Sequence, residues 1–429
     1  MKYYDRIEFA DQDEIRRIQG IRLKNTVYQA TASRFYRGKL AMAGIRVSSV
    51  NQAEDITSLP FTTKEDLRAN YPDGLLTMPV DRMVRLHASS GTTGAATVIY
   101  HTSNDLNSWA GLVARSMHAA GVRSWDVFQN MSGYGLFTGG LGIHYGAERL
   151  GCLTIPAGAG NSKRQIKMLK DFKVTVAHII PSYALHLGSV FDDLGINPRS
   201  LQLKIMLIGA EPHSEEVRRR IEAIYGVKAY NSYGLSEMNG PGVAFECEAQ
   251  SGMHLWEDSY LAEIVDPKTL EPVPDGEVGE LVLTTLCREG MPIIRYRTRD
   301  LTRFIPGDCP CGRIHKRIDR ITGRSDDMIV LKGVNIYPMQ VEKVLMSIPE
   351  VGQNYVIELE RKGYLDQMRV KVEIRDEFFV EDMRTLQALQ QKIAGLLREE
   401  ILITAKVDLV EHGSLPKNQG KAVRVVDKR

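Results

Sequence analysis

Residues 173–180 read KVTVAHII, residues 203–211 read LKIMLIGAE, and residues 227–234 read VKAYNSYG. Each of these segments is short and largely apolar, as expected for a buried strand. The intervening segments, 183–195 and 213–226, and residues 162–172 before them have apolar residues at helical spacing. This alternation predicts an α/β fold in which helices cover a largely parallel sheet.

Parallel sheets of this kind bind their ligands beyond the carboxyl ends of the strands. Two of the predicted strands end in GAEP (209–212) and in YGLSE (233–237). Ser214, directly after GAEP, is a suitable N-cap for the helix that follows. We therefore expect a ligand site where these two segments end.

The pattern changes along the chain in a way that predicts two domains. The first 80 residues read mostly as helices and connectors, and residues 257–304 form a strand-rich subdomain. The polar segment DRITGRSDD (319–327) reads as a linker, and about 100 residues of mixed helix and strand follow it. The expected domains are residues 1–325 and a small α+β C-terminal domain of residues 326–429, with the boundary near Arg324 to Asp327.

Composition excludes several classes of function. The chain has 429 residues, with 55 basic and 53 acidic side chains, so neither a nucleic-acid partner nor a membrane-surface partner is indicated. No apolar run approaches 18 residues, and no membrane span is expected. The polar N-terminus does not resemble a signal peptide, and five cysteines do not suggest a disulfide framework. These features predict a cytoplasmic protein.

The segment ASSGTTGAAT (88–97) consists mostly of small and hydroxyl-bearing residues. Glycines allow a close approach to a ligand, and hydroxyls with backbone N–H groups can surround an anion, so the segment can be a phosphate-binding loop. A surface turn has the same composition. The segment is not the common P-loop, because no lysine follows Gly94.

Several motifs together carry a family resemblance. HASSGTTG, GAEP, YGLSE, PIIRYRTRDL, RITGRSDDMIVLKGVNIYP and GKAVRV occur in this order between Tyr4 and Val426. In this combination the chain resembles the adenylate-forming superfamily of acyl-CoA synthetases, and within it the phenylacetate-CoA ligase family.

The resemblance implies an ATP-dependent, AMP-forming ligase for an aryl carboxylic acid such as phenylacetate. The acid would attack the α-phosphate of ATP, and coenzyme A would then displace AMP from the acyl-adenylate. Implied cofactors are ATP, Mg²⁺ and coenzyme A, and a homodimer is the family expectation. Alternatives are another aromatic or aliphatic acid, a carrier protein as acyl acceptor, or a non-catalytic nucleotide sensor.

The resemblance also assigns roles to residues. The loop that grips the β- and γ-phosphates would be Ser89, Ser90, Gly91, Thr92, Thr93 and Gly94. The nucleotide would contact Gly209, Ala210, Glu211, Pro212, Tyr233, Gly234, Asp300 and Arg324. Glu237 would bind Mg²⁺, and Lys421 would be the catalytic lysine of adenylation.

The resemblance also concerns the mobile C-terminal domain and the pocket for the carboxylic acid. Asp326 would be the hinge of a mobile C-terminal domain, which would bring Lys332 and Gly333 to the CoA side. The acyl pocket is predicted at Tyr134, Phe137, Gly139 and Gly140; a glycine-rich helix packed closely on the sheet is an equal alternative. Family members often carry Lys or Lys-Pro after Gly94, where this chain has Ala95 and Ala96.

The motif Cys309-Pro-Cys311-Gly places two thiols one residue apart. Cys247 and His254 lie upstream in the same strand-rich region. Three thiolates and one imidazole form a common tetrahedral set for structural zinc. The sequence therefore predicts a zinc site that staples this subdomain without taking part in catalysis; four unrelated residues remain the alternative.

Overall fold

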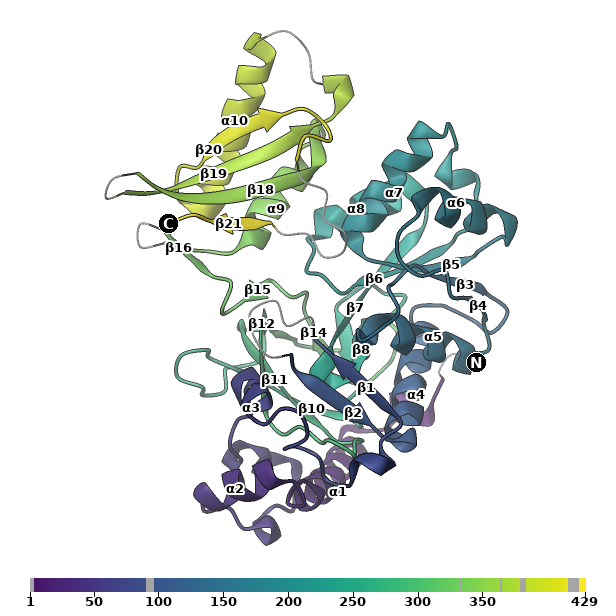
Figure 1. The fold of residues 1–429 in the computed structure, drawn as a ribbon, viewed down its shortest axis with the longest axis vertical. Helices are drawn as coiled ribbons and strands as arrows, with labels where there is room; N and C mark the ends of the chain where they lie inside the picture. Colours follow the sequence, from purple (N-terminus) through teal and green to yellow (C-terminus); the bar gives the residue numbers. More distant parts are fainter. Residues whose placement is uncertain (1–3, 90–95, 332–333, 363–364, 379–382, 416–423) are drawn as a thin grey trace. The chain divides into compact units, whose positions relative to one another are not determined.

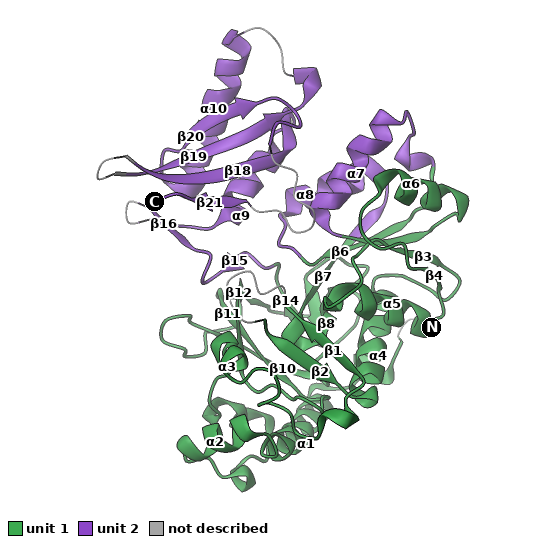
Figure 2. Ribbon diagram, viewed as in Figure 1, with its two compact units in different colours: residues 1–179, 201–210, 230–320 green, residues 180–200, 211–229, 321–429 purple. Residues whose placement is uncertain are grey.

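The computed structural model describes residues 4–89, 96–331, 334–362, 365–378, 383–415 and 424–429 (Figure 1). The chain divides into two compact units (Figure 2). Unit 1 contains residues 1–179, 201–210 and 230–320, and unit 2 contains residues 180–200, 211–229 and 321–429.

Unit 1 begins with helices and continues into sheets. Its α-helices are α1 (Gln12–Ala30), α2 (Arg34–Met42), α3 (Lys64–Ala69), α4 (Ser103–Ala119), α5 (Thr138–Leu150) and α6 (Ser162–Asp171). Short 3-10 helices lie at Arg6–Phe9, Val47–Ser49, Ala53–Ser58, Val80–Arg82 and Ser236–Met238. The first 80 residues are thus helices and connectors, as predicted.

The central element of unit 1 is a nine-stranded sheet with the order β13-β14-β9-β8-β7-β6-β5-β3-β4. Its strands are β3 (Val127–Asn130), β4 (Leu153–Ile155), β5 (Val176–Ile179), β6 (Ile205–Gly209), β7 (Lys228–Leu235), β8 (Gly240–Glu246), β9 (Met253–Leu255), β13 (Phe304–Ile305) and β14 (Arg317–Ile318). β4, β3, β5 and β6 run parallel, which confirms the helix–strand alternation read from the sequence. The strands from β7 to β13 extend the sheet in antiparallel pairs.

Helices α4 and α5 pack over this sheet and bury its main core. Trp109 and Val113 of α4 and Ile143 of α5 are buried together with strand residues such as Phe128 and Phe245. A Cβ at Gly142 would collide with Trp109, and one at Gly146 would collide with Val113. Gly142 and Gly146 therefore allow α5 to pack closely against α4.

Two smaller sheets complete unit 1. The strands β10 (Tyr260–Val265), β11 (Gly279–Thr285) and β12 (Tyr296–Thr302) are antiparallel neighbours and make up the predicted strand-rich region. β1 (Arg85–Ala88) and β2 (Val98–His101) form an antiparallel hairpin in which Ala88 pairs with Val98. These two strands flank the Ser/Thr/Gly segment in the sequence, and residues 90–95 of that segment lie outside the described ranges.

Unit 2 combines two helices of the alternating region with the C-terminal residues (Figure 2). Its helices are α7 (Pro181–Asp193), α8 (Glu215–Tyr225), α9 (Pro338–Ser347) and α10 (Met383–Ile401), with 3-10 helices at Pro198–Ser200 and Asp376–Phe378. A four-stranded sheet has the order β20-β19-β18-β21, formed by β18 (Val351–Lys362), β19 (Leu365–Ile374), β20 (Lys406–Val410) and β21 (Val425–Asp427). Short strands precede it: β15 (Gly323–Arg324), β16 (Ile329–Leu331) and β17 (Val334–Ile336).

The α+β character predicted for the C-terminal region is confirmed by its helices α9 and α10 and its four-stranded sheet. Ser214 is the N-cap of α8, and its hydroxyl accepts the N–H of Val217, as expected from the sequence. The boundary near residue 325 stays a prediction, since the compact units follow another division. No helix in the described ranges is both long and apolar enough to cross a bilayer.

Candidate active site

The base of the Ser/Thr/Gly hairpin lies beside Glu237 in unit 1. The N–H of Ser89 donates to the carbonyl of Thr97 (3.0 Å), and the Thr97 hydroxyl donates to the Ser89 hydroxyl (2.8 Å). The same Thr97 hydroxyl lies 3.5 Å from Oε1 of Glu237. Ser89 and Thr97, which flank the predicted phosphate loop in the sequence, therefore form one small polar cluster with the predicted magnesium ligand.

Glu237 lies in the 3-10 helix that follows β7. Its side chain is only 7 % exposed, and the hydroxyl of Tyr296 in β12 donates to Oε1 (3.1 Å). Both hydroxyl contacts fall on Oε1. Carboxylate oxygens are the protein ligands that Mg²⁺ prefers.

Tyr233 and Asp300 are brought together from β7 and β12. The Tyr233 hydroxyl donates to Oδ2 of Asp300 at 2.6 Å, and the ring of Tyr233 is buried. The neighbouring Arg299 approaches Glu280 (3.6 Å). The short bond orients the Asp300 carboxylate, which has four lone-pair positions for hydrogen-bond donors.

We expect Tyr233→Phe to raise the KM for ATP about ten-fold while kcat stays within about three-fold. The variant loses a hydrogen bond to a charged group, worth about 1.5–3 kcal/mol, that orients a carboxylate predicted to contact the nucleotide. Steady-state kinetics with varied ATP measures both constants. Tyr225→Phe is the matched control, because its hydroxyl is bound to the Ala184 carbonyl within unit 2. An unchanged KM would contradict the role given to Asp300.

The GAEP motif (209–212), predicted to contact the nucleotide, starts at the end of β6 in unit 1. A Cβ at Gly209 would collide with the backbone of Ser232, so only glycine allows this approach of β6 and β7. Ala210 has a φ of +68°, a left-handed conformation that is unusual for alanine. Such a turn directly after a strand is consistent with the ligand site predicted there.

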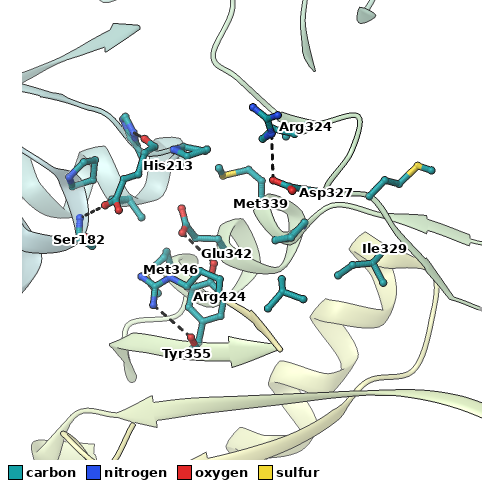
Figure 3. A pocket seen from close by; sticks show the side chains of 18 of the residues that line it. Ser182, His213, Arg324, Asp327, Ile329, Met339, Glu342, Met346, Tyr355 and Arg424 are labelled. Atoms are coloured by element: carbon teal, nitrogen blue, oxygen red, sulfur yellow. Dashed lines mark hydrogen bonds and ion pairs between the residues drawn. The ribbon is translucent and has the colours of Figure 1, made fainter. Parts of the chain in front are cut away.

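The second half of the GAEP motif, Glu211 and Pro212, lies in unit 2. There it lines a cavity of ≈ 520 Å³ (Figure 3). Glu211 and Pro212 line it together with Arg324 and Asp326. Oε1 of Glu211 accepts the N–H of Ser182 at the start of α7 (2.6 Å), where the helix dipole stabilises a carboxylate. Unit 2 therefore gathers four of the predicted site residues.

Arg324 and Asp326 are bound to each other. Nε and Nη2 of Arg324 donate to the two carboxylate oxygens of Asp326 at 2.8 and 2.9 Å. Asp327, which also approaches Arg324, has a pKa raised by burial and by the charge of Asp326. The residue predicted to contact the nucleotide and the predicted hinge are thus ion-pair partners.

A second carboxylate in the same cavity connects α9 to α8. Glu342 is almost fully buried, and its carboxylate accepts the N–H of Ser214 (2.9 Å) and the hydroxyl of Tyr355 (3.1 Å; Figure 3). Burial raises the pKa of Glu342. The guanidinium of Arg424 lies 4.4 Å from the centre of the Tyr355 ring.

The predicted acyl-pocket residues lie around the start of α5. Nδ2 of Asn130 donates to the Tyr134 hydroxyl (2.9 Å), and burial raises the pKa of Tyr134. A Cβ at Gly140 would collide with the Gly133 carbonyl, whereas no atom lies within 4 Å of one at Gly139. Open space is present at Gly139, and Phe137 is 41 % exposed; their role in acid binding stays a prediction.

The four predicted zinc ligands converge in unit 1. Their ligand atoms lie within 4.8 Å of one another, with 3.6 Å between the sulfurs of Cys247 and Cys309 and 3.3 Å from Cys311 Sγ to His254 Nε2. Zinc–ligand bonds of about 2.0–2.3 Å in a tetrahedron would place such atoms about 3.5–3.8 Å apart. Nδ1 of His254 faces the His315 carbonyl (3.2 Å), which directs Nε2 at the sulfurs.

Several predicted residues lie outside the described ranges. They are Ser90, Gly91, Thr92, Thr93, Gly94, Lys332, Gly333 and Lys421. Gly234 is described: a Cβ there would collide with the Gly240 carbonyl, so it allows the tight turn that carries Glu237.

The sequence reading missed several residues that contact predicted site residues. Thr97 and Tyr296 touch the Glu237 carboxylate, and Arg288 donates to the Glu237 carbonyl. Thr97 and Tyr296 lie within or beside quoted motifs, so their hydroxyls were a usable signal. Arg288 gave no such signal in the sequence, because its partner is a backbone atom 51 residues away.

Comparison with known proteins identifies the family of this chain. Residues 45–287 match the family model of the AMP-binding enzymes, and residues 333–429 match the AMP-binding enzyme C-terminal domain. The chain is 44% identical to phenylacetate-coenzyme A ligase of Thermus thermophilus, with 100% of both chains covered. It is also 44% identical to phenylacetate-coenzyme A ligase of Pseudomonas putida, covering 99% of this chain and 97% of that one.

A solved structure is similar over the whole chain. A 2-hydroxyisobutyryl-CoA ligase, determined in the postadenylation state in complex with 2-HIB-AMP, matches with a TM-score of 0.95 and 30% identity. The match covers 100% of this chain and 93% of that structure. The chain therefore belongs to the AMP-binding family of adenylate-forming enzymes, among the phenylacetate-coenzyme A ligases.

Proposed function

We propose that this protein is an ATP-dependent, AMP-forming ligase that joins an aryl carboxylic acid, most simply phenylacetate, to coenzyme A. The observation that carries the proposal is the cluster of Ser89, Thr97 and Glu237 at the hairpin base. It occurs in a chain whose full-length relatives are phenylacetate-coenzyme A ligases.

The reaction consists of two displacements. The acid carboxylate attacks the α-phosphorus of ATP, an acyl–AMP anhydride forms, and pyrophosphate leaves. The CoA thiol then attacks the acyl carbon, the thioester forms, AMP leaves and the thiol proton goes to solvent. The protein has to position these groups and to balance phosphate charge.

The described residues fit defined parts of this task. The hydroxyls at the hairpin base support the predicted phosphate loop, and the Asp300 carboxylate, oriented by Tyr233, suits the two ribose hydroxyls. Arg324 can exchange Asp326 for the nucleotide, which would couple nucleotide binding to the proposed hinge. Lys421, from the C-terminal tail, would stabilise the α-phosphate and the attacking carboxylate.

Glu237 fits a magnesium ion because it is a buried oxygen ligand beside Thr97, which follows the predicted phosphate loop in the sequence. When bound with ATP, Mg²⁺ supplies positive charge to the phosphate oxygens. This chain has Ala95 and Ala96 where family members often carry a lysine. A Mg²⁺ ion held by Glu237 would supply positive charge that the absent lysine does not.

A structural zinc ion is a second proposal. Cys247, His254, Cys309 and Cys311 provide the donor set, and the N–H of Arg313 donates to Cys311 Sγ (3.4 Å), as outer hydrogen bonds to thiolates do. The four residues come from the β8–β9 and β13–β14 hairpins, so the ion would join two hairpins. It would have no catalytic role.

The proposal is tested by CoA-dependent AMP formation with phenylacetate, with benzoate and hexanoate as comparison acids. Turnover that is much higher with phenylacetate supports both the chemistry and the acid. Turnover with another acid would keep the chemistry and change the substrate. No AMP with any acid, together with tight ATP binding, would favour the nucleotide sensor and overturn the proposal.

Three further points are proposals of the same kind. A phosphopantetheinyl carrier protein as acceptor is separated from CoA by the mass of the product. A cytoplasmic location suits five free thiols, and a homodimer follows only from the family resemblance. The domain boundary at residues 325 and 326 would put the Asp326 hinge at the start of the C-terminal domain.

A further inference from the structure

The turn that carries Glu237 is held by side chains. After the 3-10 helix Ser236–Met238, Asn239 and Gly240 both have left-handed φ values, +68° and +60°. The carbonyls of this turn need partners from elsewhere in the unit. Met238 O accepts the Tyr260 hydroxyl (2.9 Å), and Pro241 O accepts Nε1 of Trp109 (2.8 Å).

Arg288 supplies the donor for Glu237 itself. Its Nη1 donates to the carbonyl oxygen of Glu237 at 2.6 Å. Among the three donors to this turn only Arg288 is charged, and its side chain is 2 % exposed. The bond acts directly on the peptide unit from which the Glu237 carboxylate extends.

The segment around Arg288 is itself fixed. The N–H groups of Glu289 (2.8 Å) and Gly290 (3.3 Å) both donate to the carboxylate of Asp105, in the first turn of α4. The N–H of Leu286 donates to the carbonyl of Ser259 (2.9 Å). Arg288 therefore connects the Glu237 turn to two rigid elements, α4 and the strand β10 that follows Ser259.

Burying the Arg288 guanidinium is energetically unfavourable, which suggests that the residue has a function beyond stability. Nε and Nη2 of Arg288 have no hydrogen-bond partner among the described residues, and burial lowers the pKa of the group. A buried guanidinium with unmade bonds is destabilising, and a neutral donor such as Tyr260 can hold a carbonyl at lower cost. A guanidinium that is kept at this cost, and that makes its one side-chain bond to the Glu237 carbonyl, is best explained by the position it gives to that peptide unit.

We propose that Arg288 is a positioning residue for Glu237, fixing through the Glu237 carbonyl the carboxylate that binds the metal–nucleotide complex. This inference rests on the proposed function, since it concerns the same site. Arg288 does not touch substrate; it acts through Glu237. Its loss should weaken metal–ATP binding without impairing steps that need neither metal nor ATP.

The test measures Mn²⁺ binding in the presence of ATP and without acid, by the loss of the free Mn²⁺ signal in electron paramagnetic resonance. We expect Arg288→Met to weaken Mn²⁺–ATP binding about ten-fold, the effect of losing a hydrogen bond to a charged group. Arg288→Lys, which keeps the charge and a donor, should stay within about three-fold. Thioester formation from synthetic phenylacetyl-AMP and CoA should stay near the wild-type rate in both variants.

Arg115→Met is the matched control. Arg115 is also buried with an unpartnered Nε, but its guanidinium pairs with Asp258 (2.7 Å). Its loss should lower the melting temperature and leave Mn²⁺–ATP affinity unchanged, which separates destabilisation from positioning. If Arg288→Met does not fold, Arg288→Gln is measured in its place, with an expected weakening of about five-fold.

Unchanged Mn²⁺–ATP affinity in Arg288→Met, or in Arg288→Gln, would overturn the inference. Equal weakening in Arg115→Met would do so too, because the effect would then be general. A wild-type protein that binds Mn²⁺–ATP but forms no AMP with any acid would refute the proposed function alone. The binding measurement does not depend on turnover, so the two failures are distinguishable.

Discussion

Lys421→Ala is expected to slow acyl-adenylate formation about a thousand-fold, the cost of removing one charged group that stabilises a transition state. The lysine would neutralise charge on the α-phosphate and the attacking carboxylate as the new bond forms. Thioester formation from synthetic phenylacetyl-AMP and CoA should stay within about three-fold. Pyrophosphate release measures the first step, and CoA-thioester formation measures the second.

Lys428 provides the matched control in the same basic tail. Its Nζ forms an ion pair with Glu358 at 3.1 Å. Lys428 directly follows β21, a strand that pairs with β18. Lys428→Ala should therefore change adenylation by less than about three-fold, as for the loss of an exposed ion pair. Adenylation that is unaffected by Lys421→Ala would show that another group supplies this charge.

The sequence predicted the fold well where local periodicity decides it. The helix and strand segments between Ser162 and Gly234 appear where the pattern placed them, and Ser214 caps α8. Local signals are sufficient there because each element has a distinct apolar period and a distinct start. The antiparallel half of the central sheet was not predicted in detail, since its partners, such as β9 and β14, are far apart in the chain.

In the candidate site, too, single residues were predictable from local motifs, whereas contacts between distant segments were not. Tyr233 and Asp300 were each predicted from a motif, and the structure adds the bond between them. Arg288 escaped the sequence reading because its function depends on a carbonyl of another segment. The ion pair of Arg324 with Asp326 was also missed, although the two residues are close in sequence, because each had been assigned a separate role.

Removing the zinc ligands is expected to cause the largest change in stability. Cys311→Ser should abolish stoichiometric zinc and lower the free energy of unfolding by about 3 kcal/mol, as expected for the loss of a metal site. The apparent melting temperature should then fall by about 3–5 °C, because the entropy of unfolding is large for a unit of this size. Metal analysis by mass spectrometry and thermal melts with and without a chelator measure both effects.

The large loss of stability is expected because the zinc ion would link Cys309 and Cys311 to Cys247 and His254, far away in the sequence. Contacts to the N-terminal segment lie next to this link. Arg313, two residues after Cys311, forms a buried ion pair with Glu8, and Ile314 N–H donates to the Glu8 carbonyl (3.2 Å). Loosening the Cys309–Cys311 turn would therefore also release the N-terminal segment from the sheet. Cys152→Ser is the control for losing a buried thiol, because Cys152 donates to the Arg123 carbonyl away from the cluster. Protein purified without zinc that melts at the same temperature with and without added zinc would show that the four residues meet for another reason.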